Sequence, residues 1–105
     1  MILRPRSDFQ VQSLIRTVQG LGGFATVRHR GHEIAGVIHL VIAENTNQFT
    51  VFCATYDDEG ALSWRPSLES VADEEVDRFF EKERAFDCDL WVVDIEGGVR
   101  IKDLG

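Results

Sequence analysis

Two long apolar runs separated by a polar loop constrain this chain most. Residues 34–42 read IAGVIHLVI and residues 48–56 read QFTVFCATY, and both are rich in β-branched and aromatic residues. The AENTN segment between them is polar, so the pair predicts a β-hairpin. A loop of residues 44–47 would set Ala43 opposite Gln48. One face of the ribbon would then be fully apolar, made of Ile38, Leu40, Ile42, Phe49, Val51 and Cys53.

The opposite face of that hairpin is half apolar. It would carry Val37, His39 and Val41 opposite Ala54, Phe52 and Thr50. Because a strand alternates its side chains between two faces, a ribbon that is apolar on both sides needs cover on both. We therefore expect another element, or another chain, to cover this second face.

A second hairpin is predicted from FDCDLWVVDIEGGVRI, residues 86–101. A three-residue loop, Glu96-Gly97-Gly98, would gather the apolar residues of both strands on one face. Asp94 would then face Arg100 as a cross-strand ion pair. Asp87 and Asp89 would bond to the backbone of the turn that precedes the strand. These carboxylates are thus expected to shape and solvate a strand rather than to form a cation site.

Helical periodicity predicts two amphipathic helices. Residues 8–19 carry Val11, Leu14, Ile15 and Val18 at the spacing of one helix face, with Ser7 or Asp8 as the N-cap. A second helix is predicted over residues 73–85, with Ser70 and Asp73 as a capping box. Leu62 and Trp64 indicate a short strand that stops at Pro66, and Phe24 with Val27 fits a further short strand.

These elements predict one α+β domain over residues 1–105. The expected order is α-β-β-β-α-β-β, with an antiparallel sheet of about five strands in hairpins and both helices on one face of it. Parallel crossovers are not expected. A chain of 105 residues buries enough surface to form a core without disulfides.

Charge and cysteine content narrow the class of protein. The net charge is −7, and residues 57–105 hold fifteen of the eighteen acidic residues. Such a chain disfavours nucleic acid and anionic membranes as partners. No apolar run approaches the length of about 20 residues that spans a bilayer, and MILRPRSDF does not resemble a signal peptide, so we expect a cytoplasmic protein. Cys53 is expected to be a buried small hydrophobe, and Cys88, between two Asp, a poor nucleophile.

Four segments resemble a known family. They are VQSLIR (11–16), GGFATVRHRG (22–31), AGVIHL (35–40) and EVDRFFEKERAFDCDLWVVDIE (75–96). Together they resemble the bacterial domain-of-unknown-function family 1491. Cys88 stands where members usually have proline, and CATYDDEG (53–60) replaces a stretch of small residues and proline. The resemblance implies a shared fold and no assigned activity.

The RHRGHE segment, residues 28–33, is the best local candidate for a site. Arg28, His29, Arg30 and His32 could hold a phosphate or another anion through guanidinium forks and loop N–H groups. The alternative is a solvated turn on the positively charged half of the chain. His29, His32 and Glu33 are too few to predict a metal site. No cofactor and no catalytic residue are predicted.

The sequence favours binding over catalysis. We expect a protein-association module that pairs with itself or with a larger partner, through the apolar residues Val37, Val41, Phe52 and Trp64. The alternative is a small ligand-binding or anion-binding protein, or an enzyme, that uses the Arg28–Glu33 loop.

Overall fold

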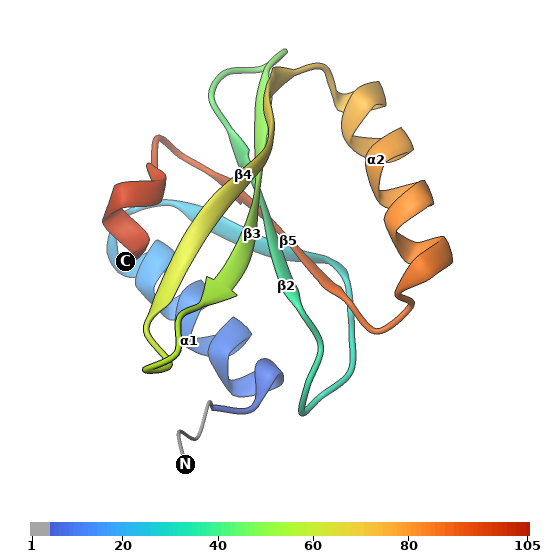
Figure 1. Ribbon diagram of the computed structural model, residues 1–105. Helices are drawn as coiled ribbons and strands as arrows, with labels where there is room; N and C mark the ends of the chain where they lie inside the picture. Colours follow the sequence, from blue (N-terminus) through green and yellow to red (C-terminus); the bar gives the residue numbers. More distant parts are fainter. Residues whose placement is uncertain (1–4) are drawn as a thin grey trace.

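A computed structural model describes residues 5–105 of the chain (Figure 1). This part of the chain forms two α-helices, five β-strands and a short 3-10 helix. In chain order they are α1 (Ser7–Gly20), β1 (Phe24–His29), β2 (Ile38–Ala43), β3 (Phe49–Tyr56), β4 (Leu62–Val71), α2 (Asp73–Phe86), β5 (Trp91–Glu96) and η1 (Ile101–Leu104). Neither α-helix within residues 5–105 is long and apolar enough to cross a lipid bilayer.

The five strands form one sheet in the order β1-β5-β2-β3-β4. Every neighbouring pair is antiparallel except β2 and β5, which run parallel. Helix α2 makes the crossover that connects edge strand β4 to central strand β5. The predicted α+β fold with two helices and a mostly antiparallel sheet is confirmed, and the expectation that the chain lacks parallel crossovers is wrong.

The two helices lie on opposite faces of the sheet, so the expectation that both cover one face is wrong (Figure 1). On the α1 face, Val11 and Val18 pack into one buried cluster with the strand residues Leu40, Val93 and Ile95. On the α2 face, Val76 and Phe80 pack into a second cluster with Val41, Val51 and Val92. Strands buried on both faces read as continuous apolar runs. Cover by α2 therefore explains why the second face of the β2–β3 hairpin is apolar.

The register of the β2–β3 hairpin differs by one residue from the prediction. Ala43 pairs with Phe49 rather than with Gln48, and Val41 pairs with Val51. Gln48 belongs to the turn, where its carbonyl oxygen accepts the Glu44 N–H at 2.9 Å. The prediction assumed that only one face had to be fully apolar. Because both faces of the hairpin are covered, the requirement for one fully apolar face did not select the register.

The predicted closing hairpin does not form. Strand β5 already has β1 on one side and β2 on the other, so no hydrogen-bonding edge is left for the residues that follow it. Residues Ile101–Leu104 turn instead into η1. Asp94 pairs with Arg28 of β1 rather than with Arg100, whose own N–H donates to Asp103.

Helix α2 begins as predicted but without the expected capping box. Its N-cap is Ala72, and the Ser70 hydroxyl donates to the Glu44 carboxylate. Ser70 has a φ of 52°, in the left-handed region, directly before the chain leaves β4 for α2. Strand β4 continues past Pro66 to Val71 because it is an edge strand, where a missing N–H need not break the ladder.

The start of α1 also differs from the predicted cap. Its N-cap is Arg6, and Ser7 lies inside the helix. The buried Ser7 hydroxyl donates to the Gly36 carbonyl oxygen at 2.7 Å. Ser7 thus fixes the beginning of α1 against the loop that leads into β2.

Candidate binding groove

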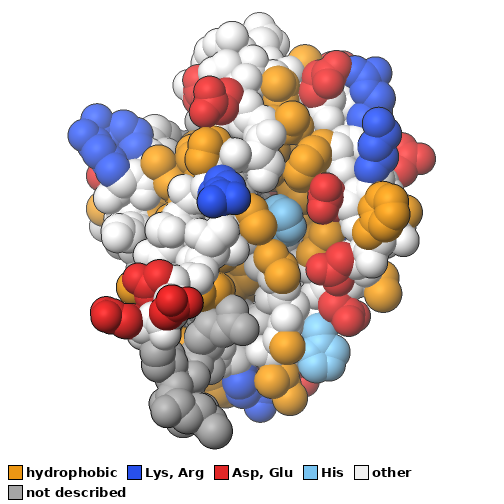
Figure 2. Space-filling view, viewed as in Figure 1, with side chains coloured by type: hydrophobic (Ala, Val, Ile, Leu, Met, Phe, Trp, Pro, Cys, Tyr) orange, Lys and Arg blue, Asp and Glu red, His pale blue; other side chains and the backbone are white. Residues whose placement is uncertain are grey.

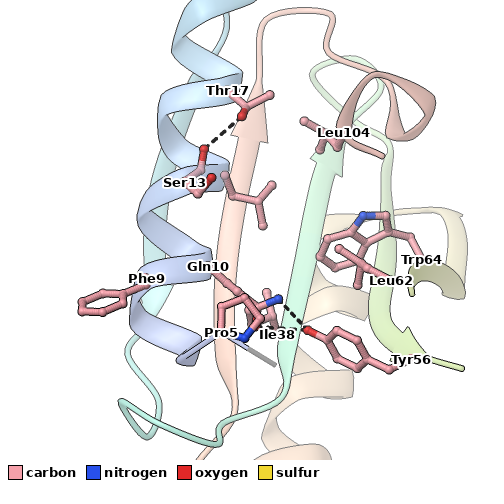
Figure 3. Close-up of a pocket in the computed structure, with 11 residues that line it drawn as sticks. Pro5, Phe9, Gln10, Ser13, Thr17, Ile38, Tyr56, Leu62, Trp64 and Leu104 are labelled. Carbon is pink, nitrogen blue, oxygen red and sulfur yellow. Dashed lines mark hydrogen bonds between the residues drawn. The ribbon is translucent and has the colours of Figure 1, made fainter. Parts of the chain in front are cut away.

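A concavity lined mainly by apolar side chains lies between α1 and the β3–β4 hairpin (Figure 3). It has a volume of about 390 Å³, within the range of about 300–1,000 Å³ that is usual for binding pockets. Its lining comprises Pro5, Phe9, Gln10, Ser13, Leu14, Thr17, Ile38, Tyr56, Leu62, Trp64 and Leu104. Helix α1 forms one wall, β4 forms the other, and Leu104 of η1 closes one end.

The groove exists because a single helix covers the α1 face of a five-stranded sheet. Neighbouring strands are about 4.8 Å apart, and a helix with its side chains is about 10–12 Å wide, so one helix covers two to three strands. Helix α1 packs on the β1 side of the sheet. Ile101 and Leu104 of η1 cover part of the remaining face, and the rest stays open.

A second hollow continues the first one toward the loop before β2. It has a volume of about 300 Å³ and is lined by residues 34–38, together with Pro5, Ser7, Gln10, Ala54 and Tyr56. Gln10 and Tyr56 line both hollows and point toward each other from α1 and β3 (Figure 3). Their side chains are hydrogen-bonded, with 2.8 Å between Gln10 Nε2 and the Tyr56 hydroxyl oxygen. We refer to the two hollows together as the α1 groove.

Exposed apolar side chains gather along the α1 groove. Among the described residues, eight large apolar side chains are exposed, and four of these residues line the groove: Phe9, Ile34, Val37 and Leu62. The Phe9 ring is 57% exposed and points outward from α1 (Figure 3), so it extends the apolar surface past the edge of the groove. Apolar side chains concentrated around a concavity are typical of interaction sites.

The polar groups of the groove do not form a catalytic arrangement. Its described lining includes neither a carboxylate nor a histidine, lysine, arginine or cysteine side chain. The Thr17 hydroxyl is occupied, since it donates to the Ser13 carbonyl oxygen at 3.0 Å. General acid–base chemistry needs a positioned titratable group. Tyr56 is the titratable side chain in this lining, and its hydroxyl is hydrogen-bonded to Gln10.

The residues predicted as an interface do not share one face. Val37 and Trp64 line the α1 groove, and Phe52 packs partly buried against the cluster on the same side. Val41 is 1% exposed and lies beneath α2. Val41 therefore does not contribute to an exposed face, because it lies on the face of β2 that α2 covers. An interface role for the other three stays a prediction.

Sequence reasoning missed the α1 wall of the groove. Gln10, Ser13 and Thr17 read as ordinary polar positions of a surface helix, and the floor residue Tyr56 read only as the end of a strand. One signal was present: Phe9 is a large apolar residue outside the stripe formed by Val11, Leu14, Ile15 and Val18.

Arg28, the first of the predicted anion-binding residues, is occupied by carboxylates. Its guanidinium donates to Asp94 of β5 at 3.0 Å, and to Asp73 and Asp77 of α2 at 3.3 Å each. Burial raises the pKa of Asp94, and the hydrogen bond from Arg28 opposes that rise. The Arg28 cluster, meaning Arg28 with these three acids, thus ties β1 to β5 and to α2.

The other three predicted residues are also engaged or lie near acids. Arg30 lies over the Trp91 ring at 5.1 Å and pairs with Glu33 at 3.8 Å. His32 Nδ1 accepts the N–H groups of residues 34 and 35. His29 lines a hollow against α2 that also contains Asp77 and Glu81. Anion binding by this segment stays a prediction.

The remaining candidates from the sequence are Asp87, the possible metal ligands and the two cysteines. Asp87 accepts the Asp89 N–H at 3.0 Å, which confirms its predicted role in the turn before β5. Among the described residues, no group of three His, Cys, Asp or Glu side chains is placed to hold a metal ion. Cys53 is half-buried, and burial raises the pKa of its thiol. Cys88 is exposed.

Comparison with known proteins agrees with this fold. The sequence profile of DUF1491, a family described as a protein of unknown function, matches residues 6–100. The chain belongs to the DUF1491 family. No curated protein matches it.

Solved structures of similar proteins share the architecture. The chain is similar to the solution structure of protein Atu0922 from A. tumefaciens, with 31% identity, a TM-score of 0.85, and coverage of 97% of this chain and 93% of that one. A crystal structure of a DUF1491 family protein from Caulobacter crescentus CB15 shows 27% identity, a TM-score of 0.78, and coverage of 90% and 89%. An NMR structure of a DUF1491 family protein from the same organism shows 26% identity, a TM-score of 0.76, and coverage of 94% and 92%.

Proposed function

We propose that this DUF1491 chain is a protein-association domain that holds an apolar segment of another protein in the α1 groove. The observation that carries the proposal is the gathering of four of the eight exposed large apolar residues along one concavity. Burial of apolar surface is the main driving force of most protein association. The cytoplasmic location of this association stays a prediction.

The groove has the composition of a recognition site. Tyr56 and Trp64 supply aromatic surface, and aromatic residues are enriched where interfaces bind most strongly. The Gln10–Tyr56 pair adds a polar group in the middle of the groove. An enzyme would need titratable groups in the same place, and the described lining holds none of the carboxylate, histidine, lysine, arginine or cysteine type.

A pair of matched variants tests the proposal. Ser13→Phe places a ring in the groove from an exposed position on α1, and Gln12→Phe places the same ring on the same helix outside the groove. Proteins captured from a cell extract by the wild type and by Gln12→Phe, but not by Ser13→Phe, would be groove partners. Identical capture by the two variants would refute the proposal.

Self-association is a separate outcome that light scattering after size exclusion detects. A dimer that Ser13→Phe dissociates and Gln12→Phe leaves intact would mean that the groove pairs with a second copy. A titration with inorganic phosphate tests the predicted anion site independently. A melting temperature raised by phosphate in the wild type, but not in Arg30→Ala, would support anion binding by residues 28–33.

A further inference from the structure

We infer that the segment recognised by the α1 groove is a short amphipathic helix that carries Lys or Arg at the end beside the β3–β4 turn. This inference rests on the proposed function and names the class of partner. It combines three features: the shape of the open sheet face, the charge at one end of it, and the absence of an unoccupied amphipathic helix within residues 5–105.

The shape of the groove matches a second helix beside α1. Gln10, Ser13, Leu14 and Thr17 form its wall at the i, i+3, i+4 and i+7 spacing of one helix face. From Phe9 to Thr17 this wall spans nine residues, a rise of about 12 Å at 1.5 Å per residue, which is about two turns. The floor belongs to the part of the sheet that α1 and η1 leave uncovered. Helix-in-groove recognition uses this geometry.

The charge at one end of the groove is negative and unpaired. Tyr56 and Leu62 line the groove and flank the β3–β4 turn, which carries Asp57, Asp58 and Glu59. Within residues 5–105, none of these three acids takes part in an ion pair. Figure 2 shows acidic side chains gathered over this turn. A partner with a basic end would complement the turn, and such rim charges select partners and speed their association.

The described part of a second copy, residues 5–105, does not supply this segment. Helices α1 and α2 already bury their apolar stripes in the two cores, through Val11 and Val18 in one case and Val76 and Phe80 in the other. Two copies would also carry a net charge of −7 each and repel one another. The occupant is therefore a segment of a different, basic-ended partner.

Selection from a phage-displayed library of random 14-residue peptides tests the inference. Peptides that bind the wild type and Gln12→Phe, but not Ser13→Phe, report on the groove. We expect their sequences to share apolar residues at i, i+3 or i+4, and i+7, with Lys or Arg at one end. The enriched peptides, made synthetically, should gain helical circular dichroism on binding.

A charge variant of the turn separates the inference from the proposed function. Asp58→Asn/Glu59→Gln removes two charges and keeps Asp57, whose carboxylate accepts the Glu59 and Ala61 N–H groups. For two rim charges we expect about 3- to 10-fold weaker peptide binding. The control, Glu74→Gln/Glu81→Gln on α2, should leave affinity unchanged. Replacing the peptide's own Lys or Arg with Gln should weaken binding to the wild type and not to the turn variant.

Each result decides between the two proposals. Groove-dependent peptides that lack a basic end, bind in an extended form, or ignore the turn variant would overturn the inference and leave the proposed function standing. If no peptide depends on the groove, both fail. Helical peptides with a basic end that lose affinity in the turn variant would support both.

Discussion

The two faces of the sheet are both apolar, but they are covered in different ways. On the α2 face, apolar packing is joined by polar ties: Arg28 bonds to acids of β5 and α2, and the His39 ring packs edge-to-face on Phe79 and Phe80. On the α1 face, α1 and η1 share the cover and leave the groove between them. Both faces contribute core packing, and under the proposed function the α1 face also keeps apolar surface available for a partner.

The largest expected effect distinguishes a buried ring from an exposed one. Phe80 is 4% exposed between His39 and Phe79, so Phe80→Ala leaves a cavity and should cost about 3–5 kcal/mol of the free energy of unfolding. The control is Phe9→Ala at the groove, which should cost less than about 1 kcal/mol. Urea unfolding measures both. Equal losses would contradict the division of roles between the faces.

A second, smaller effect is expected at the Arg28 cluster. Arg28→Met removes the donor of three charge-assisted hydrogen bonds and leaves the partly buried Asp94 without its cation. We expect a loss of about 1–3 kcal/mol in the free energy of unfolding. Arg78→Ala, which breaks the exposed pair with Glu75, is the control and should cost at most about 0.5 kcal/mol. A neutral Arg28→Met would mean that the cluster is a solvated surface feature.

The third prediction concerns acid sensitivity of the α2 face. Burial lowers the pKa of His39, and the acids Glu83 and Asp87 only partly oppose that shift. Its Nδ1 has no hydrogen-bond partner among the described residues. Because the folded state disfavours the protonated ring, the contribution of His39 to stability is complete above about pH 6.5 and is lost as the pH falls below it.

Replacing His39 should flatten this dependence. Unfolding measured between pH 7.5 and 5.0 should show a smaller loss of stability for His39→Leu than for the wild type. Val41→Ala, which removes buried apolar surface on the same face and no titratable group, is the control and should keep the wild-type slope. The same slope in wild type and His39→Leu would show that His39 does not titrate with folding.

The smallest expected effect on stability belongs to the groove itself. Ser13→Phe fills a space that the folded domain leaves open, so the free energy of unfolding should change by no more than about 0.5 kcal/mol. Partner binding should be lost all the same. A large loss of stability would instead mean that Ser13 supports the packing of α1.

Sequence reasoning succeeded where the pattern is local. Both helices follow from the spacing of their own apolar residues, and the β2–β3 hairpin follows from two runs joined by a short polar loop. It failed where pairing is distant. Strand β5 pairs with β1 and β2, which lie more than 40 residues earlier in the chain, and nothing near Trp91–Glu96 indicates those neighbours.

The candidate site was only partly predictable for a related reason. Trp64 and Val37 stood out as apolar residues in excess of what two helices could cover, and both line the groove. The groove itself depends on where the single helix lies across the sheet and on η1 replacing the expected strand. Periodicity in the sequence does not specify either of these.

The position of β5 has a consequence for how the domain assembles during synthesis. Strand β5 lies inside the sheet, flanked by β1 and β2, and it is the last strand that the ribosome produces. Until it emerges, β1 has no neighbouring strand, and one edge of the β2-β3-β4 sheet is unpaired. Nascent chains of this domain should therefore expose both unpaired edges until residues 91–96 arrive, a state in which chaperones have most to protect.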